Sequence, residues 1–329
     1  MITNQQRRNF IEILKKEGPL YILDAEEEYR SDFIIIKGLI RFNGAIIGCA
    51  SEKLRKTEAL LDIVAKRPND YLVKVNGKPS DFAIQFIDEK YLSKHPEVVL
   101  EFLKENMEYA GVLSDKVLFS KKKIYTYVLE NLERNPMLWY RLKPEDQMNK
   151  KVIMKVIHEM PNMIGKLLTE LQSDIEVLER AAQNHHEGFN TVCAMYSVMD
   201  KAVQKDPAVC KTLVKADPRV FPYLKYCDEE IAKVALAYNG EFIQRLPKKM
   251  ITRDLVETAL QQNGMALQYL KEEVYDDKEL VMIAVKNCGW AIKCASPRLQ
   301  DDADIIDASL TSSPELSKYG VKRKGNNKR

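Results

Sequence analysis

Apolar residues recur with the same spacing in three segments near the C-terminus. The segments are residues 231–240, 255–264 and 280–289. Apolar residues occupy the first, second, fifth and sixth places of each, and in the second segment these are Leu255, Val256, Ala259 and Leu260. Residues three and four places apart lie on one side of an α-helix, whereas a strand alternates at every second residue. The spacing therefore predicts three amphipathic helices.

Each segment ends in a glycine, and a second apolar stripe follows it. Gly240, Gly264 and Gly289 are 24 and 25 residues apart, and in the second copy the stripe lies within residues 266–270. We interpret each unit as a helix A, a tight turn and a helix B. Because glycine adopts a positive φ without a Cβ penalty, we expect these glycines to end helix A in that conformation.

Polar residues before each helix A have the pattern of N-terminal caps. Asp276 and Glu279 have the spacing of a capping box, in which Asp276 accepts from backbone N–H groups and Glu279 reaches back. Thr252 and the pair Asp301 and Asp302 stand at the matching places of the neighbouring units, where we expect the same role.

The same template fits residues 31–56, where Asn43 and Gly44 separate two apolar stripes. Between this copy and the clear repeats at 228–302 the pattern is weaker, but turn residues continue at a similar rhythm. They are Asn69, Asn106, Asn135, Pro161, His186 to Gly188, and Asp217. Together with the four glycines they indicate ten units. Residues 75–81, in the widest gap, are expected to form a protruding loop.

These units predict an all-α fold, an α-solenoid of about ten short helix–turn–helix repeats with a period of about 24 residues. One pair of short helices cannot bury its apolar stripe alone, so neighbouring pairs must stack to form the core. The expected parts are an N-terminal capping helix and connection at 1–30, the solenoid at 31–302, a capping helix at 303–319 and a basic disordered tail at 320–329.

Residues 254–302 carry a motif that resembles a known family. The family signature D-K-E-x-V-x-x-A-V-x-x-x-G-x-A-L is matched from Asp277 to Ile292 and is followed by Asp301 and Asp302. The segment is therefore similar to the uncharacterised family called domain of unknown function 4116. This resemblance implies tandem helical repeats, and it adds no catalytic residue.

Composition and charge narrow the classes of function. Of 329 residues, 45% are hydrophobic and 30% charged, which is too much apolar material for a disordered polymer. There are 51 basic and 48 acidic residues, and five of the basic residues lie among the last nine. Without those five, 46 basic residues face 48 acidic ones. The body of the protein thus has no general basic surplus to attract nucleic acid.

Cysteine usage and the N-terminus predict the compartment. The six cysteines include no C-x-x-C pair, and a chain of this size does not need disulfides, which favours reduced thiols. The N-terminus lacks the apolar core of a signal peptide, and no stretch approaches the ~18 apolar residues of a membrane span. We therefore expect a cytoplasmic protein with no membrane partner.

Two histidine motifs resemble metal sites, and each is incomplete. Residues 158–162 begin like the zinc pattern H-E-x-x-H, but Asn162 stands where the second histidine must be. His185, His186 and Glu187, with Cys193 nearby, are potential ligands, but no spacing among them fixes a tetrahedron. We expect no metal site.

Residues 77–80 superficially resemble a phosphate-binding loop. The earlier glycine of that motif is replaced by Leu72, and Pro79 removes a backbone donor. With no arrangement of nucleophile and base visible either, we expect no catalytic residue, no cofactor, no small-molecule substrate and no enzymatic activity.

The leading hypothesis is a non-enzymatic scaffold or adaptor that binds a protein through the exposed face of the solenoid. Trp290 is in register with Met265 and Glu241, a mixture typical of a part-exposed position, and aromatic and arginine side chains often anchor partners. Trp139, by contrast, is in register with core positions. The proposed partner-binding residues are Trp290, Arg298, Tyr140 and Arg141.

The alternative hypothesis is RNA or DNA binding along the repeat junctions. Tyr125, Tyr127 and Tyr223 are available to stack on bases, and lysines near the junctions are available to phosphates. These lysines are Lys121, Lys122, Lys123, Lys150, Lys151, Lys248 and Lys249. The hypothesis requires that they form a continuous stripe.

Overall fold

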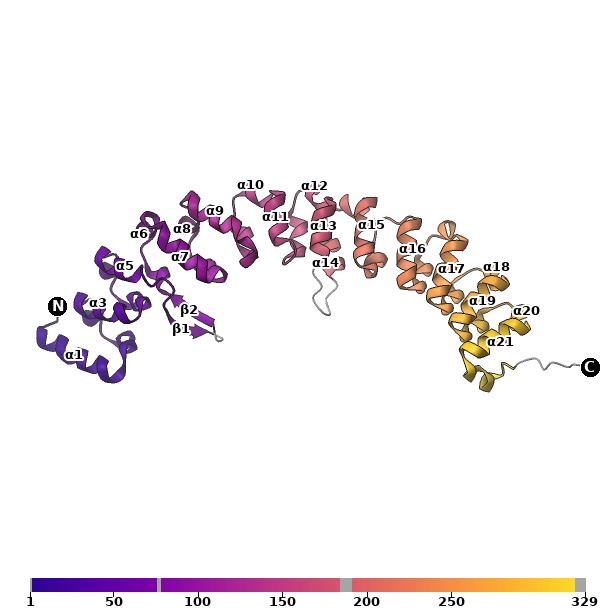
Figure 1. Cartoon of the computed structure of the whole chain (residues 1–329), viewed down its shortest axis with the longest axis horizontal. Helices are drawn as coiled ribbons and strands as arrows, with labels where there is room; N and C mark the ends of the chain where they lie inside the picture. Colours follow the sequence, from indigo (N-terminus) through magenta and orange to yellow (C-terminus); the bar gives the residue numbers. More distant parts are fainter. Residues whose placement is uncertain (1, 76–77, 184–190, 323–329) are drawn as a thin grey trace, which may run out of the picture. The chain divides into compact units, whose positions relative to one another are not determined.

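Helices make up most of the chain that the structure describes. The computed structural model (Figure 1) describes residues 2–75, 78–183 and 191–322. Within these ranges there is a single two-stranded sheet, so the all-α prediction is confirmed. The chain divides into two compact units, Met1–Val156 and Ile157–Arg329, each with its own packed helices.

The first unit intersperses α-helices of four to fourteen residues with 3-10 helices of three to six residues. The α-helices are α1 (Asn4–Glu17), α2 (Glu27–Arg30), α3 (Phe33–Phe42), α4 (Glu52–Arg55), α5 (Glu58–Val64), α6 (Glu89–Lys94), α7 (Pro96–Asn106), α8 (Asp115–Leu118), α9 (Lys122–Glu130), α10 (Pro144–Gln147) and α11 (Lys150–Val156). The 3-10 helices are η1 (Pro19–Asp24), η2 (Gly44–Cys49), η3 (Ala83–Phe86), η4 (Met107–Val112), η5 (Leu132–Arg134) and η6 (Pro136–Arg141).

The second unit intersperses the two kinds of helix in the same way. The α-helices are α12 (Thr169–Gln172), α13 (Ile175–Ala182), α14 (Thr191–Val198), α15 (Pro207–Ala216), α16 (Glu229–Tyr238), α17 (Arg253–Gln262), α18 (Glu272–Tyr275), α19 (Lys278–Asn287), α20 (Pro297–Gln300) and α21 (Ala303–Ser312). The 3-10 helices are η7 (Pro161–Lys166), η8 (Val203–Lys205), η9 (Pro218–Tyr223), η10 (Gly240–Arg245), η11 (Lys248–Met250), η12 (Gly264–Tyr269), η13 (Gly289–Cys294) and η14 (Pro314–Tyr319).

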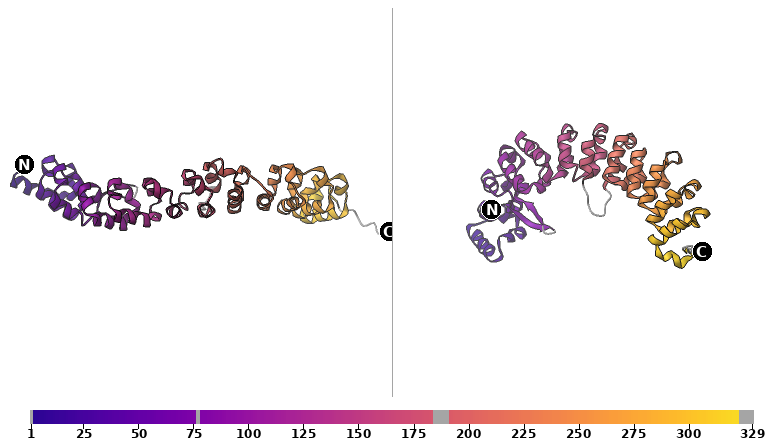
Figure 2. Two further views of the ribbon diagram at one scale, coloured as in Figure 1. Left: turned by 90° about the horizontal axis from the view of Figure 1, so that it is seen from above. Right: turned by 45° about the vertical axis from the view of Figure 1, so that its right-hand side comes forward.

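The C-terminal part of the second unit repeats one arrangement. The ten-residue helices α16, α17, α19 and α21 pack side by side in chain order, and η10, η12 and η13 pack on one another in a second row (Figure 2). The apolar stripe identified in the sequence forms the core between them. In α17, for example, Leu255, Val256, Ala259 and Leu260 are all buried.

The second helix of each unit is shorter than expected. The predicted helix B after Gly264 consists of the 3-10 helix η12, an extended residue Leu270 and the single-turn helix α18. Two polar side chains stabilise this path. Asn263 accepts from the N–H of Met265 at the start of η12, and the Tyr275 hydroxyl donates to the carbonyl of Leu270 at 2.6 Å. These bonds satisfy backbone groups that a continuous α-helix would have paired internally.

The turn glycines do not have a positive φ, and that prediction is wrong. Among the glycines that the structure describes, a positive φ occurs at Gly18 and Gly320. A Cβ placed on Gly240, Gly264 or Gly289 would instead lie 2.2–2.3 Å from a carbonyl oxygen of the next long helix. Glycine is required there because the turn packs directly against the backbone of the neighbouring repeat.

The helix caps agree in part with the sequence prediction. Thr252 and Asp302 are N-caps, as expected. The N-cap of α19 is Asp277, whose carboxylate accepts from the N–H groups of Glu279 and Leu280, so the assignment of this role to Asp276 is wrong. At the N-terminus, α1 spans Asn4–Glu17 and lies within the segment 1–30 expected to hold a capping helix.

The segment predicted as a protruding loop contains a β-hairpin. Strands β1 (Tyr71–Val75) and β2 (Lys78–Phe82) pair antiparallel, with Tyr71 opposite Phe82. Phe82 is buried against the rings of Phe102 and Tyr109, at 5.4 and 5.0 Å between ring centres. This aromatic cluster attaches the end of the hairpin to α7 and η4.

Candidate functional site

Trp290, the first proposed binding residue, is held by its own chain. Its indole Nε1 donates to Glu315 at 2.9 Å, and its ring packs edge-on against Tyr319. The ammonium of Lys293 lies over the indole, 4.4 Å from the ring centre. The N–H group and one face of this tryptophan are therefore used to attach η14 to η13.

Arg298 likewise has a partner within the second unit. Its guanidinium donates to the carboxylate of Asp276 at 3.0 Å and to the carbonyl of the same residue at 2.8 Å. A hydrogen bond from Ser296, and then this arginine, lower the pKa of Asp276 below its ordinary value. Arg298 thus ties α20 to the end of α18.

Tyr140 and Arg141 lie next to one another on η6 but differ in exposure. Tyr140 is 45% exposed, whereas Trp139 is buried as its register predicts. Arg141 donates to Asp115 at 2.7 Å and to the carbonyl of Leu113 at 2.6 Å. Of the four proposed residues, Tyr140 is the one whose polar group forms no hydrogen bond with the described residues, although its ring packs edge-on against Trp139. Tyr140 and Arg141 belong to the first unit, and Trp290 and Arg298 to the second.

The lysines of the nucleic-acid hypothesis lie at the starts of three helices. Residues 121–123 are exposed where α9 begins, and residues 248 and 249 are exposed in η11. At the start of α11, Lys150 is half-buried and Lys151 exposed. Tyr125, proposed to stack on bases, donates its hydroxyl to Asp146, and burial together with this bond raises its pKa to about 12.

Two cations at the starts of long helices in the second unit pair with acids of the next repeat. Arg253 at the start of α17 pairs with Asp277 at 2.7 Å, and Lys278 at the start of α19 pairs with Asp302 at 2.9 Å. Each ion pair joins the first turn of one helix to the N-cap of the next long helix. Neither cation is among the lysines of the nucleic-acid hypothesis.

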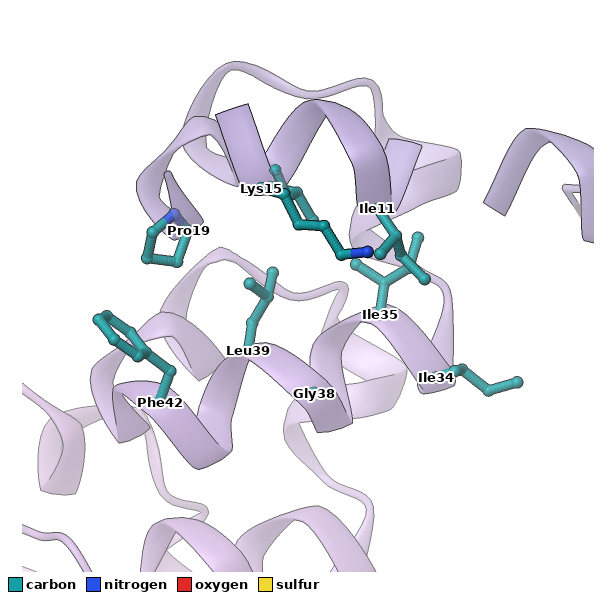
Figure 3. Close-up of a pocket in the computed structure, with 9 residues that line it drawn as sticks. Ile11, Lys15, Pro19, Ile34, Ile35, Gly38, Leu39 and Phe42 are labelled. Carbon is teal, nitrogen blue, oxygen red and sulfur yellow. The ribbon is translucent and has the colours of Figure 1, made fainter. Parts of the chain in front are cut away.

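An apolar groove opens between α1 and α3 in the first unit (Figure 3). It has a volume of about 320 Å³. We call it the N-terminal groove, and its lining residues are Ile11, Leu14, Lys15, Pro19, Ile34, Ile35, Gly38, Leu39 and Phe42. In Figure 3 the side chains of Ile35 and Leu39 point from α3 toward α1, and Lys15 reaches across from α1.

Exposed large apolar side chains are concentrated in the segment of the chain that forms the N-terminal groove. Of sixteen such side chains among the described residues, seven lie between positions 13 and 42. They are Ile13, Leu20, Tyr21, Leu23, Phe33, Ile34 and Phe42. Two of the seven line the groove itself, Phe42 at 66% and Ile34 at 56% exposure. Exposed apolar surface beside a hollow is typical of a binding site.

Gly38 forms part of the groove without a packing reason for a glycine. It lies in the middle of α3, where its φ is not positive, and a Cβ added to it would meet no atom within 4 Å. An interior helical glycine is about 1 kcal/mol less favourable than alanine. The gain from glycine here is the open space above α3, which a side chain would occupy.

The potential metal ligands and thiols of the described residues do not gather in one place. No three His, Cys, Asp or Glu side chains there are close enough to hold a metal ion, and His158 contacts Glu159 at 2.8 Å. Burial raises the pKa of Cys210, and it raises the pKa of Cys227 to about 11, so neither is an activated thiolate.

Some features named in the sequence analysis lie outside the described residues. They are the motif at residues 185–187, the turn at 186–188, Gly77 and tail residues 323–329.

The comparison with known families identifies the C-terminal repeats. Residues 228–274 and 277–319 match the model of the family described as a domain of unknown function, DUF4116. The resemblance inferred from the motif at 254–302 is thereby confirmed over residues 228–319. No curated protein and no solved structure matches the chain.

The two DUF4116 segments contain Trp290, Arg298 and the turn glycines Gly240, Gly264 and Gly289, whereas the N-terminal groove lies outside them. Sequence reasoning missed this groove, although one signal was present. Seven of the ten residues of α3 are aliphatic or aromatic, more than one buried stripe requires. The surplus consists of Phe33, Ile34 and Phe42, which are the exposed ones.

No helix among the described residues combines the length and the apolar content needed to cross a bilayer.

Proposed function

We propose that the chain is a non-enzymatic α-solenoid of about ten helix–turn–helix repeats, which acts as a scaffold or adaptor by binding a protein partner. The N-terminal groove carries this proposal, because it presents an apolar surface that the residues described by the structure leave uncovered. Burial of apolar surface contributes about 25 cal/mol per Å², so covering Ile34 and Phe42 favours association. Side-by-side packing of α16, α17, α19 and α21 supports the solenoid architecture.

The groove is a better candidate than the residues chosen from the sequence. Trp290, Arg298 and Arg141 form hydrogen bonds within the chain, which a partner would have to displace. Ile34 and Phe42 offer more than half of their surface to solvent without such competition. Central apolar anchors of this kind provide most of the energy of protein interfaces.

Affinity purification from the native host tests the proposal. The bait proteins are the wild type, Phe42→Asp, and Met137→Asp as the matched control, since Met137 is 63% exposed on η6. We expect a specific protein to co-purify with the wild type and with Met137→Asp, and to be lost with Phe42→Asp. Circular dichroism of the three proteins checks that the folds are equal.

Two results would contradict the proposal. One is a protein partner retained by Phe42→Asp, which would place the interface elsewhere. The other is a nucleic acid that co-purifies equally with all three baits and dissociates steeply with added salt, as phosphate contacts do. The second result would favour the lysines at residues 121–123, 150–151 and 248–249.

A further inference from the structure

The N-terminal groove has the geometry of a binding site for one helix. Ile34, Gly38 and Phe42 are four residues apart on α3, so they follow one face of the helix for ~12 Å. On the opposite side, Ile11 and Leu14 are three residues apart on α1. Two helices that present apolar residues at these intervals match the i, i+3, i+4 and i+7 stripe of a third.

The charges on the two helices that form the groove are mainly positive. α1 contains Arg7, Arg8, Lys15 and Lys16 against Glu12 and Glu17, and α3 contains Lys37 and Arg41 with no acid.

Some of these cations already have partners. Arg7 is paired with Asp32 at 2.7 Å, and Lys15 pairs with Glu12 on the exposed surface. Lys37 lies over the ring of Phe33, 5.5 Å from its centre, and Arg41 is exposed. The surplus on α3 is therefore left for a partner to neutralise.

Acids at one end of the groove limit where an occupant can place its own. Glu28 and Asp32 border a second hollow of about 380 Å³ that shares Ile34 with the groove, and of the two Asp32 is paired with Arg7. Carboxylates of the occupant are repelled at that end. They are attracted toward Lys37 and Arg41, on the other part of α3.

We infer that the occupant of the N-terminal groove is an amphipathic helix of a protein partner, with acidic residues bordering its apolar stripe. This inference rests on the proposed function and adds the chemistry of the partner. Gly38 is the point of closest approach, because without a side chain it lets a helix backbone lie directly on α3. A concave, cation-bordered groove of this size fits an acid-flanked helix better than a flat lipid surface.

A library of displayed helical peptides tests the inference. Each peptide has leucine at four positions spaced i, i+3, i+4 and i+7, and the flanking positions are randomised among Glu, Lys, Gln and Ser. The library is selected on the full chain and counter-selected on Gly38→Leu, whose side chain fills the groove. We expect enrichment of Glu at the flanks, and at least tenfold weaker binding of the enriched peptide to Gly38→Leu by fluorescence anisotropy.

Two further variants separate the groove and its charge from general effects. Gly111→Leu is the control for the added side chain, because Gly111 is also exposed with no atom near its Cβ position, and it must bind the peptide as the wild type does. The double variant Lys37→Glu, Arg41→Glu must prefer the Lys-flanked version of the same peptide. Exchange of the preferred peptide charge would show that these two residues recognise the flanks.

Each other outcome overturns the inference. Enrichment of Lys flanks, or peptides that bind Gly38→Leu equally well, would exclude the acid-flanked helix. Groove-dependent binding to phosphatidylserine vesicles without peptide binding would identify a lipid surface, and groove-dependent self-association in sedimentation would identify a second copy. If Phe42→Asp still loses the native partner in these cases, the proposed function stands and only the helix chemistry fails.

Discussion

The side chain of Gln262 holds the turn of the preceding repeat at Gly240. Its Oε1 accepts the N–H of Gly240 at 2.6 Å, and its Nε2 donates to the carbonyl of Tyr238 at 3.0 Å. One repeat later, Asn287 accepts from Gly264 at 2.7 Å and donates to the carbonyl of Gln261 at 2.7 Å. In both helices the side-chain amide of the last residue therefore forms two hydrogen bonds with the backbone of the preceding repeat. We call this pair of bonds an amide clamp.

Removal of a clamp is expected to destabilise the second unit. Asn287→Leu leaves the N–H of buried Gly264 without its acceptor, and an unsatisfied buried donor costs about 1–3 kcal/mol. The free energy of unfolding in urea should fall by this amount. The control is Gln261→Leu, which replaces an exposed amide one repeat earlier. Equal stability of the two variants would show that the clamp contributes nothing.

The turn glycines are expected to differ in their tolerance of alanine. In Gly264→Ala the new Cβ would lie 2.2 Å from the carbonyl oxygen of Ala284, and the repeats must separate, at a cost of about 1–3 kcal/mol. At Gly44 the nearest atoms are 3.4 Å away, so Gly44→Ala should change stability by less than about 1 kcal/mol. Urea denaturation of both proteins measures the difference. If Gly44→Ala were the more damaging change, close packing would not be the reason for glycine at these turns.

The ion pairs between repeats are expected to make stability fall in acid. A hydrogen bond from Lys278 lowers the pKa of Asp302 in the folded protein. A group with a lowered folded pKa adds stability above its unfolded pKa, about 3.9 for aspartate, and loses it as the pH falls through the folded value. Lys278→Met should therefore reduce stability slightly at pH 7 and have no effect near pH 2. Urea midpoints across pH 2–7 measure this, and an effect of equal size at both ends would contradict it.

Trp290 is expected to stabilise the free protein. Trp290→Ala removes the contacts with Tyr319 and Lys293, each an interaction of about 0.5–1.5 kcal/mol, and the hydrogen bond to Glu315. The unfolding free energy should fall, while Met137→Ala, at an exposed position of η6, should change it little. If the Trp290→Ala protein were as stable as the wild type, the contacts of Trp290 within the chain would contribute little to stability. Trp290 would then be available as an anchor for a partner.

Local patterns in the sequence predict much of the fold, because the apolar residues at the first, second, fifth and sixth places are the buried ones. They also identify the turns at Gly240, Gly264 and Gly289. They do not reveal why glycine is there, since that depends on the backbone of a repeat 24 residues away. The 3-10 geometry of η12 is equally hidden, because it is stabilised by the side chains of Asn263 and Tyr275.

The candidate site was less predictable than the fold. The part-exposed position of Trp290 follows from its register. The bonds of Trp290 to Glu315 and of Arg298 to Asp276 do not, because they connect residues 22 to 25 positions apart. The N-terminal groove depends on the space between α1 and α3, which no pattern along a single helix contains. Only the excess of apolar residues in α3 points to it.

Gly38 is expected to reduce the stability of the protein while keeping its groove open. Alanine at this position meets no atom within 4 Å and gains the helix propensity that glycine lacks, so Gly38→Ala should raise the free energy of unfolding by about 0.5–1 kcal/mol. The larger Gly38→Leu should keep this gain and lose the peptide. A stabilising change that abolishes binding would show that helix stability and an open groove conflict at this residue, as expected where a local rule is broken at a functional site. A loss of stability in Gly38→Ala would instead mean that the glycine serves the packing of α3.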